Sequence, residues 1–320
     1  MQAPNGPSKR VHTGKPLSKR ILENWQMYLF LLIPMVWLIV FKYWPMYGVT
    51  IAFKKYAPKA GILGSPWVGF EYLVRFFQSY QFNRTVFNTV YLSMMSMIIT
   101  FPIPIIFALL LNSVRSTKYK GVVENVTYMP HFISTVVVMV GILRRIFDIN
   151  TGMINNLVEL IPGVNYTLNM FMGGHNFRVL YILSGIWQST GWGSIIYMAA
   201  LSSVDPEQHE AATIDGASRL QRVLHVDIPA IIPTITVTLI LRFGSVMGIG
   251  FDKAYLMQND TNLVASEVIA TYVYKAGLTS TANDAFSYAT AIGLFNSGVN
   301  LFFVLLVNKI ADKVNGSGLW

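Results

Sequence analysis

The chain contains six long apolar stretches, at about residues 25–45, 88–111, 126–147, 179–201, 229–250 and 288–308. A helix of about 20 apolar residues is long enough to cross the hydrocarbon core of a bilayer, which is roughly 30 Å thick. Lipid offers no hydrogen-bond partner to an exposed backbone, so such stretches are confined to helices. We therefore expect an all-α polytopic membrane protein with six transmembrane helices. In this prediction residues 21–320 form a single transmembrane domain.

The composition agrees with a membrane protein. Hydrophobic residues make up 53% of the 320 residues and charged residues only 12%, whereas soluble domains carry about 25% charged residues. The chain has no cysteine, which removes disulfides and thiolate chemistry, and its five histidines are scattered without metal-ligand spacing. We expect no metal site, no cofactor and no catalytic residue in this chain.

The N-terminal tail, residues 1–20, gives the expected orientation. Its basic residues are Lys9, Arg10, Lys15, Lys19 and Arg20. A basic cluster beside an apolar span marks the cytoplasmic side, and a segment rich in proline, glycine and charge tends to be disordered. Six spans then return the C-terminus to the cytoplasm. Other lysines and arginines fall in the expected outer loops and oppose this orientation, so it depends on the tail and on the loop described next.

A polar, helix-prone loop at residues 205–229 separates the fourth and fifth spans. It contains Glu210-Ala211-Ala212-Thr213-Ile214-Asp215-Gly216 and, after nine further residues, Val226-Asp227-Ile228-Pro229. Asp205 is a good N-cap and Pro206 suits the first helical position, so a short helix is expected to begin there.

The residues within this loop suit a surface that meets a partner. Glu207 and Glu210 favour the first turn of the helix through its dipole. Ala211 and Ala212 are small enough for a partner to approach closely, and Gly216 allows the chain to turn toward the fifth span. The alternative is an ordinary amphipathic loop helix whose alanine content is due to chance.

This loop closely resembles the EAA loop in the membrane subunits of binding-protein-dependent ABC importers, with Val226 and Ile228 in place of the family's isoleucine and leucine. Trp67-Val68-Gly69-Phe70-Glu71-Tyr72 is similar to the sugar-permease branch. Gly250-Phe251-Asp252-Lys253 is similar to a narrower group of oligosaccharide permeases, of the aldouronate and alginate type. The resemblance covers nearly the whole chain. It implies the type I ABC importer permease fold in the bacterial cytoplasmic (inner) membrane.

The resemblance also implies the partners of this chain. They are a second homologous permease, most often a different gene product, two cytoplasmic ABC ATPase subunits and an extracytoplasmic solute-binding protein. ATP and Mg would be bound by the ATPases, because the only Gly-Lys pair here, Gly14-Lys15, is followed by proline and lacks the P-loop pattern. No nucleic-acid partner is expected.

The resemblance also implies roles for single residues of the loop. Glu210 would pair with a basic group on the ATPase and Gly216 would form the bend. The expected ATPase-coupling residues are Glu207, Glu210, Ala211, Ala212, Asp215 and Gly216.

Polar and aromatic residues within the spans are candidates for the substrate pathway. Arg242 stands in an apolar span, where a charge normally faces the bundle interior or a wet cavity. It would contact a carboxylate or hydroxyl of a passing sugar, or it is a structural cation held by carbonyls, a partner subunit or Asp252. Sugar rings present apolar faces to aromatic rings and hydroxyls to amides. The other candidates are Trp187, Gln188, Trp192 and Tyr197, spaced so that they can share one helical face, with Asn296 and Asn300 four residues apart. For each aromatic residue, packing or interfacial anchoring is the alternative.

The sequence thus predicts the transmembrane subunit of an ATP-driven importer that moves an oligosaccharide from a binding protein to the cytoplasm by alternating access. The narrower hypothesis is an acidic, uronate-containing cargo. An ABC permease for peptides or amino acids is the alternative, because the EAA loop does not report the cargo. A stand-alone secondary transporter is a further alternative, but the spans lack the Asp and Glu residues that ion coupling requires.

Overall fold

The computed structural model describes residues 23–133, 138–161 and 168–315. In these ranges the chain consists of helices joined by turns and loops, with one isolated antiparallel bridge between Lys54 and Trp67. The expected all-α class is confirmed. The tail predicted to be disordered, residues 1–20, lies outside the described residues. The chain forms two units, residues 1–50 and 51–320.

The described part of the first unit is a single apolar helix. α2 (Trp25–Leu38) continues through a π-helical turn at Ile39–Tyr43 into α3 (Trp44–Met46). Pro34 lies inside α2 and does not end it. No residue of α2 is buried. A helix that is apolar on every side is suited to lipid.

Four helical segments among the described residues are long and apolar enough to cross a membrane: Trp25–Phe53, Tyr80–Asn112, Arg219–Phe243 and Ala285–Lys313. The second consists of α6 (Tyr80–Thr100) and α7 (Pro102–Asn112), and the residue between them keeps helical dihedral angles. α11 (Gly174–Ser202) covers the expected fourth span with 29 residues, about 43 Å at 1.5 Å per residue.

The expected third span, residues 126–147, is not one continuous helix in the described ranges. α8 (Thr117–Phe132) begins earlier, because Ser116 Oγ accepts a hydrogen bond from Tyr119 N at 3.3 Å and caps it. It ends shortly after Pro130, where Ile133 is extended. α9 (Val140–Ile146) follows beyond residues 134–137. The total of six spans remains a prediction.

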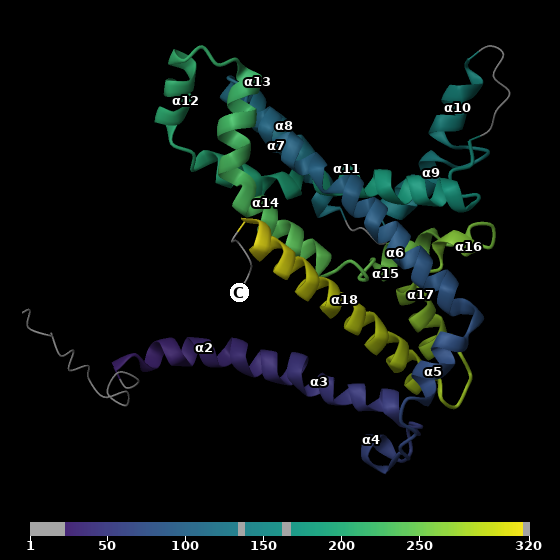
Figure 1. The fold of residues 1–320 in the computed structure, drawn as a ribbon. Helices are drawn as coiled ribbons and strands as arrows, with labels where there is room; N and C mark the ends of the chain where they lie inside the picture. Colours follow the sequence, from purple (N-terminus) through teal and green to yellow (C-terminus); the bar gives the residue numbers. More distant parts are fainter. Residues whose placement is uncertain (1–22, 134–137, 162–167, 316–320) are drawn as a thin grey trace, which may run out of the picture. The chain divides into compact units, whose positions relative to one another are not determined.

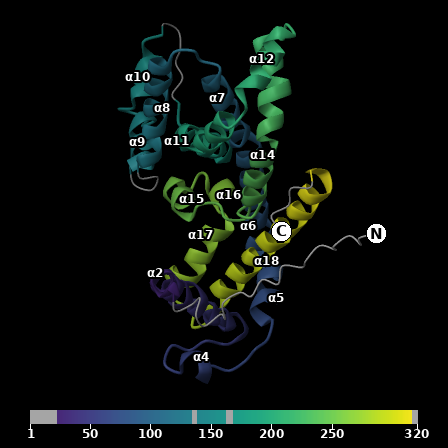
Figure 2. The ribbon, with the colours of Figure 1, turned by 90° about the vertical axis from the view of Figure 1, so that its left-hand side faces the viewer.

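Short helices lie between these segments (Figure 1). They are α4 (Gly61–Gly64), α5 (Glu71–Gln78), α10 (Met153–Glu159), α12 (Pro206–Ile214), α13 (Arg219–Arg222), α15 (Phe251–Met257), α16 (Leu263–Ser266) and α17 (Ile269–Tyr274). The last two long helices are α14 (Ile228–Phe243) and α18 (Ala285–Asn315). α18 lies beside α14 and α17 (Figures 1 and 2).

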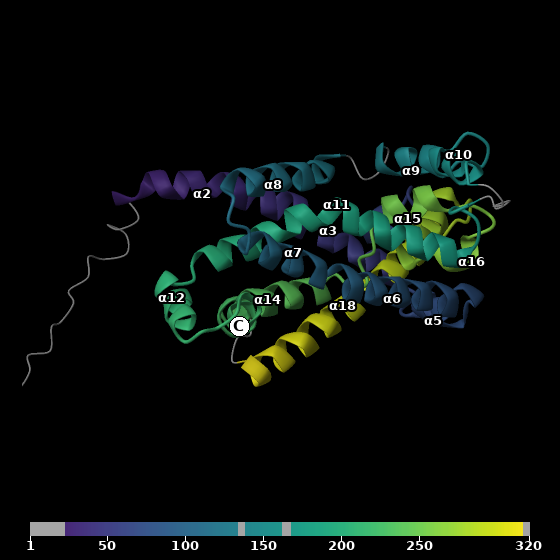
Figure 3. The same ribbon diagram turned by 90° about the horizontal axis from the view of Figure 1, so that it is seen from above.

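The second unit is packed around α11. This helix contacts α6, α7, α8, α14, α15 and α16, and Figure 3 shows it running beside α7 and α8. A Cβ added at Gly191 would lie 2.2 Å from the backbone oxygen of Thr127 in α8. A Cβ added at Gly193 would lie 3.2 Å from Pro104 in α7. Small residues of this kind allow membrane helices to approach one another closely.

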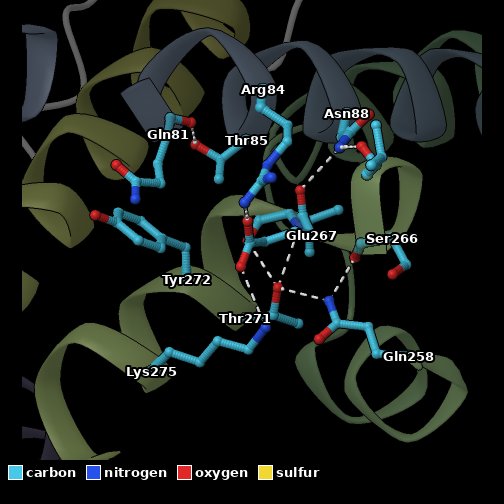
Figure 4. Close-up of polar contacts among 12 residues, drawn as sticks. Gln81, Arg84, Thr85, Asn88, Gln258, Ser266, Glu267, Thr271, Tyr272 and Lys275 are labelled. Atoms are coloured by element: carbon cyan, nitrogen blue, oxygen red, sulfur yellow. Dashed lines mark hydrogen bonds and ion pairs between the residues drawn. The ribbon is translucent and has the colours of Figure 1, made fainter. Parts of the chain in front are cut away.

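A network of ion pairs and hydrogen bonds joins residues 258–275 to the first half of α6 (Figure 4). Glu267 is buried and pairs with Arg84 of α6 and with Lys275 Nζ, the latter at 3.1 Å. Asn88 Nδ2 of α6 donates to two backbone carbonyls of this segment, at 2.7 and 3.1 Å. A buried charge is tolerated when it is paired and hydrogen-bonded. The loop before α18 is therefore part of the packed structure.

Gly191→Ala should weaken the packing of α11 on α8. A methyl group 2.2 Å from a carbonyl oxygen forces the two helices apart, and overpacking typically costs about 1–3 kcal/mol. Gly185→Ala is the matched control on the same helix, because its Cβ would meet only Lys253 Nζ, at 3.4 Å. Thermal unfolding in detergent should show a lower midpoint for Gly191→Ala alone. Equal midpoints for the two variants would contradict this close approach.

Candidate functional site

The loop at residues 205–229 begins with a capped helix. α12 starts at Pro206, and Asp205 Oδ1 accepts a hydrogen bond from Glu207 N at 3.0 Å. The cap and the acidic first turn both complement the positive end of the helix dipole. The helix start that the sequence predicts is therefore present in the structure.

α12 ends in a Schellman turn at Gly216, whose φ is +77°. Gly216 N donates to Thr213 O at 3.1 Å, and Ala217 N donates to Ala212 O at 2.9 Å. Glycine adopts this left-handed conformation without a Cβ penalty. The bend expected at Gly216 is thus a specific helix stop that reverses the chain.

The return segment starts with a second cap. Ser218 Oγ accepts from Gln221 N at 3.3 Å, while Gln221 Oε1 accepts from Ser218 N at 2.7 Å, which completes a capping box. From Arg219 to Phe243 the chain then forms one helical segment, with a π-helical turn at Val223–Asp227. α12 lies near the N-terminal end of α14, where α13 leads into that helix (Figures 1 and 2).

Two side-chain contacts fasten α12 to this return segment. Arg222 Nη1 donates to Thr213 Oγ1 at 2.8 Å. His209 Nε2 lies 3.2 Å from Asp227 Oδ1, and Asp227 is only 3% exposed. Both contacts therefore tie α12 to the first residues of the helical segment Arg219–Phe243. Sequence analysis missed the His209–Asp227 pair, because no local spacing links residues on two different helices.

The described residues leave most of α12 exposed. No residue of α12 is buried, and Ile214 is 86% exposed. Ala211 and Asp215 are also exposed, whereas Ala212 is half-buried.

Beside α12 lies a polar cavity of about 520 Å³. Its lining includes Glu210 together with Arg115, Arg219 and Arg222. Glu210 is exposed, and it forms no ion pair with another described residue. This carboxylate is therefore free to meet a basic group from outside the chain.

Three of the candidate pathway residues lie in the middle of α11. Trp187 and Trp192 are about half exposed. Trp192 stacks on His131 of α8, with ring centroids 4.4 Å apart and an interplanar angle of 1°. Gln188 Nε2 donates to the backbone oxygen of Ile133 at 3.2 Å. Gln188 and Trp192 therefore face the C-terminal end of α8.

Tyr197 does not share that face. It is buried, and its hydroxyl is hydrogen-bonded to Thr238 Oγ1 of α14 at 2.9 Å. Five residues at about 100° each place it roughly 140° around the helix from Trp192. Tyr197 thus packs between α11 and α14, as the packing alternative predicts for an aromatic residue.

Arg242 lies in the last turn of α14 and is exposed. Its Nη1 is 3.5 Å from Thr100 Oγ1, and its guanidinium is 6.0 Å from the ring centroid of Phe101. No carboxylate pairs with it among the described residues, so Asp252 does not hold it.

The two asparagines of α18 have different surroundings. Asn300 Oδ1 accepts a hydrogen bond from Met247 N at 2.7 Å, which fixes the segment after α14. Asn296 Oδ1 is buried and has no hydrogen-bond partner among the described residues. Within those residues, no group of three or more His, Cys, Asp or Glu side chains is placed to hold a metal ion.

Residues 81–316 match the family described as the binding-protein-dependent transport system inner membrane component. The chain belongs to this family. It is therefore a multi-pass component of the inner membrane that works with a separate binding protein. The family and the membrane location expected from the EAA loop are confirmed.

Two proteins of Bacillus subtilis (strain 168) are similar to this chain over nearly their whole length. Protein LplB is 42% identical over 298 residues, which cover 93% of this chain and 92% of the relative. The polygalacturonan/rhamnogalacturonan transport system permease protein YteP is 40% identical over 306 residues, which cover 96% and 94%.

Solved structures of a bacterial ABC transporter for the acidic polysaccharide alginate contain a similar chain. That chain is 36% identical, with a TM-score of 0.84, and the match covers 94% of this chain and 100% of that one. In the complex with an alginate pentasaccharide-bound periplasmic protein the TM-score is 0.85. The type I ABC importer permease fold is therefore confirmed.

Gly216→Val should loosen the turn after α12. A left-handed residue with a Cβ costs about 1–2 kcal/mol, and Gly216→Asn should be milder because asparagine tolerates this conformation. An added Cβ meets open space at Gly216 and equally at Gly298 in α18, so Gly298→Val is the control for added bulk. Trypsin should cleave at the exposed Arg219 several-fold faster in Gly216→Val than in Gly298→Val. Equal cleavage rates would contradict the structural role of this turn.

Proposed function

We propose that this chain is a transmembrane subunit of an ATP-driven importer that takes up uronate-containing oligosaccharides. The observation that carries the proposal is its similarity, over more than nine-tenths of its length, to the permease chain of an alginate importer and to a polygalacturonan/rhamnogalacturonan permease. Those two proteins are named for different polymers, but both polymers are rich in sugar acids. A carboxylate-bearing sugar chain is the cargo chemistry that they share.

In this proposal the partners surround the chain on both sides of the membrane. Two ABC ATPase subunits bind ATP and Mg and dock on α12, a second permease completes the pathway, and a binding protein delivers the sugar. The exposed Glu210, Ala211 and Ile214 form the docking face for one ATPase. This chain supplies no catalytic group, since ATP hydrolysis takes place on the partners.

The mechanism uses the rigid connection between α12 and α14. When the ATPases close on ATP, α12 moves with them, and the His209–Asp227 and Arg222–Thr213 contacts pass that motion to α14. α11 ends at Ser202, just before the cap of α12. Both long helices are therefore displaced together, and the pathway opens alternately to the two sides.

The test is the ATPase activity of the complete complex with loaded binding protein. Three sugars of equal length are compared: a galacturonate trisaccharide, its methyl ester and maltotriose. The galacturonate should stimulate hydrolysis most. Glu210→Ala should lower this stimulation at least several-fold, because the docking carboxylate is lost. Glu71→Ala on α5 is the control and should behave as wild type.

Each contrary outcome points to a different part of the proposal. Stimulation by maltotriose alone would overturn the acidic cargo while leaving the importer. An unchanged response of Glu210→Ala would overturn the role of α12 in coupling. A complex that contains no ATPase would overturn the assembly itself.

A further inference from the structure

The first expected outer loop contains a basic stretch, residues 54–70, that has no acidic residue. Its charged residues are Lys54, Lys55 and Lys59, and they oppose the usual bias of basic residues toward the cytoplasmic side. No ion pair joins any of the three to a carboxylate among the described residues. The proposed function gives these cations no role. Their charge is suited to an anionic partner outside the chain.

This stretch is held in a fixed turn by its own hydrogen bonds. Lys54 Nζ donates to Ile62 O at 2.9 Å. Ala57 N donates to Oγ of the buried Ser65 at 3.0 Å. An antiparallel bridge between Lys54 and Trp67 closes the turn. The side chains at its tip are therefore held in one arrangement.

Large apolar side chains project from this turn into the surroundings. Leu63 of α4 is 83% exposed, Trp67 is 64% exposed and Phe70 is 67% exposed. The rings of Trp67 and Phe70 both pack on Phe53, with centroids 5.7 and 5.4 Å from it. The lysines that are exposed on the same turn are Lys55 and Lys59. Apolar side chains and unpaired ammonium groups thus occur together on one short surface.

The turn is attached to the ends of two segments that are suited to crossing the membrane. The first of these apolar segments ends at Phe53, directly before Lys54. The second is α18, and Ser287 in its first turn is buried. Ser287 Oγ donates to Lys54 O at 2.7 Å and accepts from Tyr56 N at 3.0 Å. The turn is therefore held where such helices leave the hydrocarbon and meet the headgroups.

A leaflet that contains anionic phospholipids fits the charge, the apolar side chains and the place of this turn. Tryptophan is enriched where headgroups meet acyl chains. Lysine lays its apolar stem along the hydrocarbon while its ammonium group reaches the polar region. Segments that lie in the interface combine such side chains, and anionic lipid strengthens their binding. A binding protein would meet this turn only while it is docked, whereas lipid surrounds the helix ends at all times.

We propose that the turn at residues 54–70 binds the anionic lipid surface of the outer leaflet. Leu63 and Trp67 insert among the acyl chains near the headgroups, and Lys55 and Lys59 bind lipid phosphates. Because the turn is bonded to the first turn of α18, this contact also anchors the outer end of that helix. The inference goes beyond the proposed function, since it holds for any cargo.

The test measures the surroundings of Leu63 in the complete complex, reconstituted in phosphatidylcholine vesicles with and without phosphatidylglycerol. The chain has no cysteine, so Leu63→Cys, with cysteine-free partner subunits, carries a single fluorophore. Val264→Cys in α16 is the matched control, because Val264 is 72% exposed in the last expected outer loop. With phosphatidylglycerol present, a nitroxide on a lipid acyl chain should quench the label at Leu63 at least three-fold more than the label at Val264. Acrylamide in the water should show the reverse order.

The lysines are tested with the same label at Leu63. Lys55→Gln combined with Lys59→Gln should lower the quenching by lipid at least two-fold and make it equal in the two kinds of vesicle, because the phosphates lose both partners. Lys118→Gln combined with Lys120→Gln is the control. It removes the same charge from the expected cytoplasmic side, and it should leave the quenching unchanged.

Three outcomes would overturn the inference. Equal quenching of the labels at Leu63 and Val264 by lipid would show that the turn does not enter the leaflet. If acrylamide reaches the label at Leu63 until the binding protein is added, the surface docks that protein instead. Quenching that ignores both phosphatidylglycerol and the two lysine substitutions would exclude an anionic partner. Should Leu63→Cys fail to assemble, Phe70→Cys on the same turn takes its place, with the same expected results.

Discussion

The close approach of α11 to its neighbours is the constraint on which the second unit depends. Gly191 brings the backbone of α11 against α8, and Gly193 admits α7. At its first residue, Gly174, an added Cβ would lie 2.5 Å from Ala265 Cβ in α16, and at its other end α11 leads into the cap of α12. One helix of 29 residues thus joins the loop at residues 205–229 to the segment before α18. In the proposed mechanism a long helix packed this tightly is displaced as a unit.

Polar contacts are concentrated where the chain needs fixed geometry. At one end, His209 and Asp227 join α12 to the start of α14. In the segment before α18, Glu267 is held by Arg84 and Lys275. Buried charges are costly unless they are paired, and Glu267 meets this condition through its two basic partners. Arg242 differs from them, because no carboxylate among the described residues pairs with it.

The sequence predicted the local features of this structure well and the contacts between helices poorly. The start of α12 at Pro206 and its end near Gly216 follow from capping and glycine chemistry, which act within a few residues. Hydropathy predicts a continuous third span, because it does not register the extended Ile133 after Pro130. A spacing of five residues suggests that Tyr197 shares a face with Trp192, but it separates the two by roughly 140° around the helix. The contact between His209 and Asp227 could not be predicted, because it joins residues on two different helices.

The central claim is that α12 docks on an ATPase, and site-directed cross-linking tests it most directly. The chain has no cysteine, so Ile214→Cys, at a position that is 86% exposed, introduces a unique thiol. Leu63→Cys in α4 is the control, because Leu63 is 83% exposed in the first expected outer loop. In membranes that contain the complete complex, a short thiol-to-amine reagent should join Ile214→Cys, and not Leu63→Cys, to an ATPase subunit. Cross-linking of the ATPase to Leu63→Cys, or to neither position, would contradict this account.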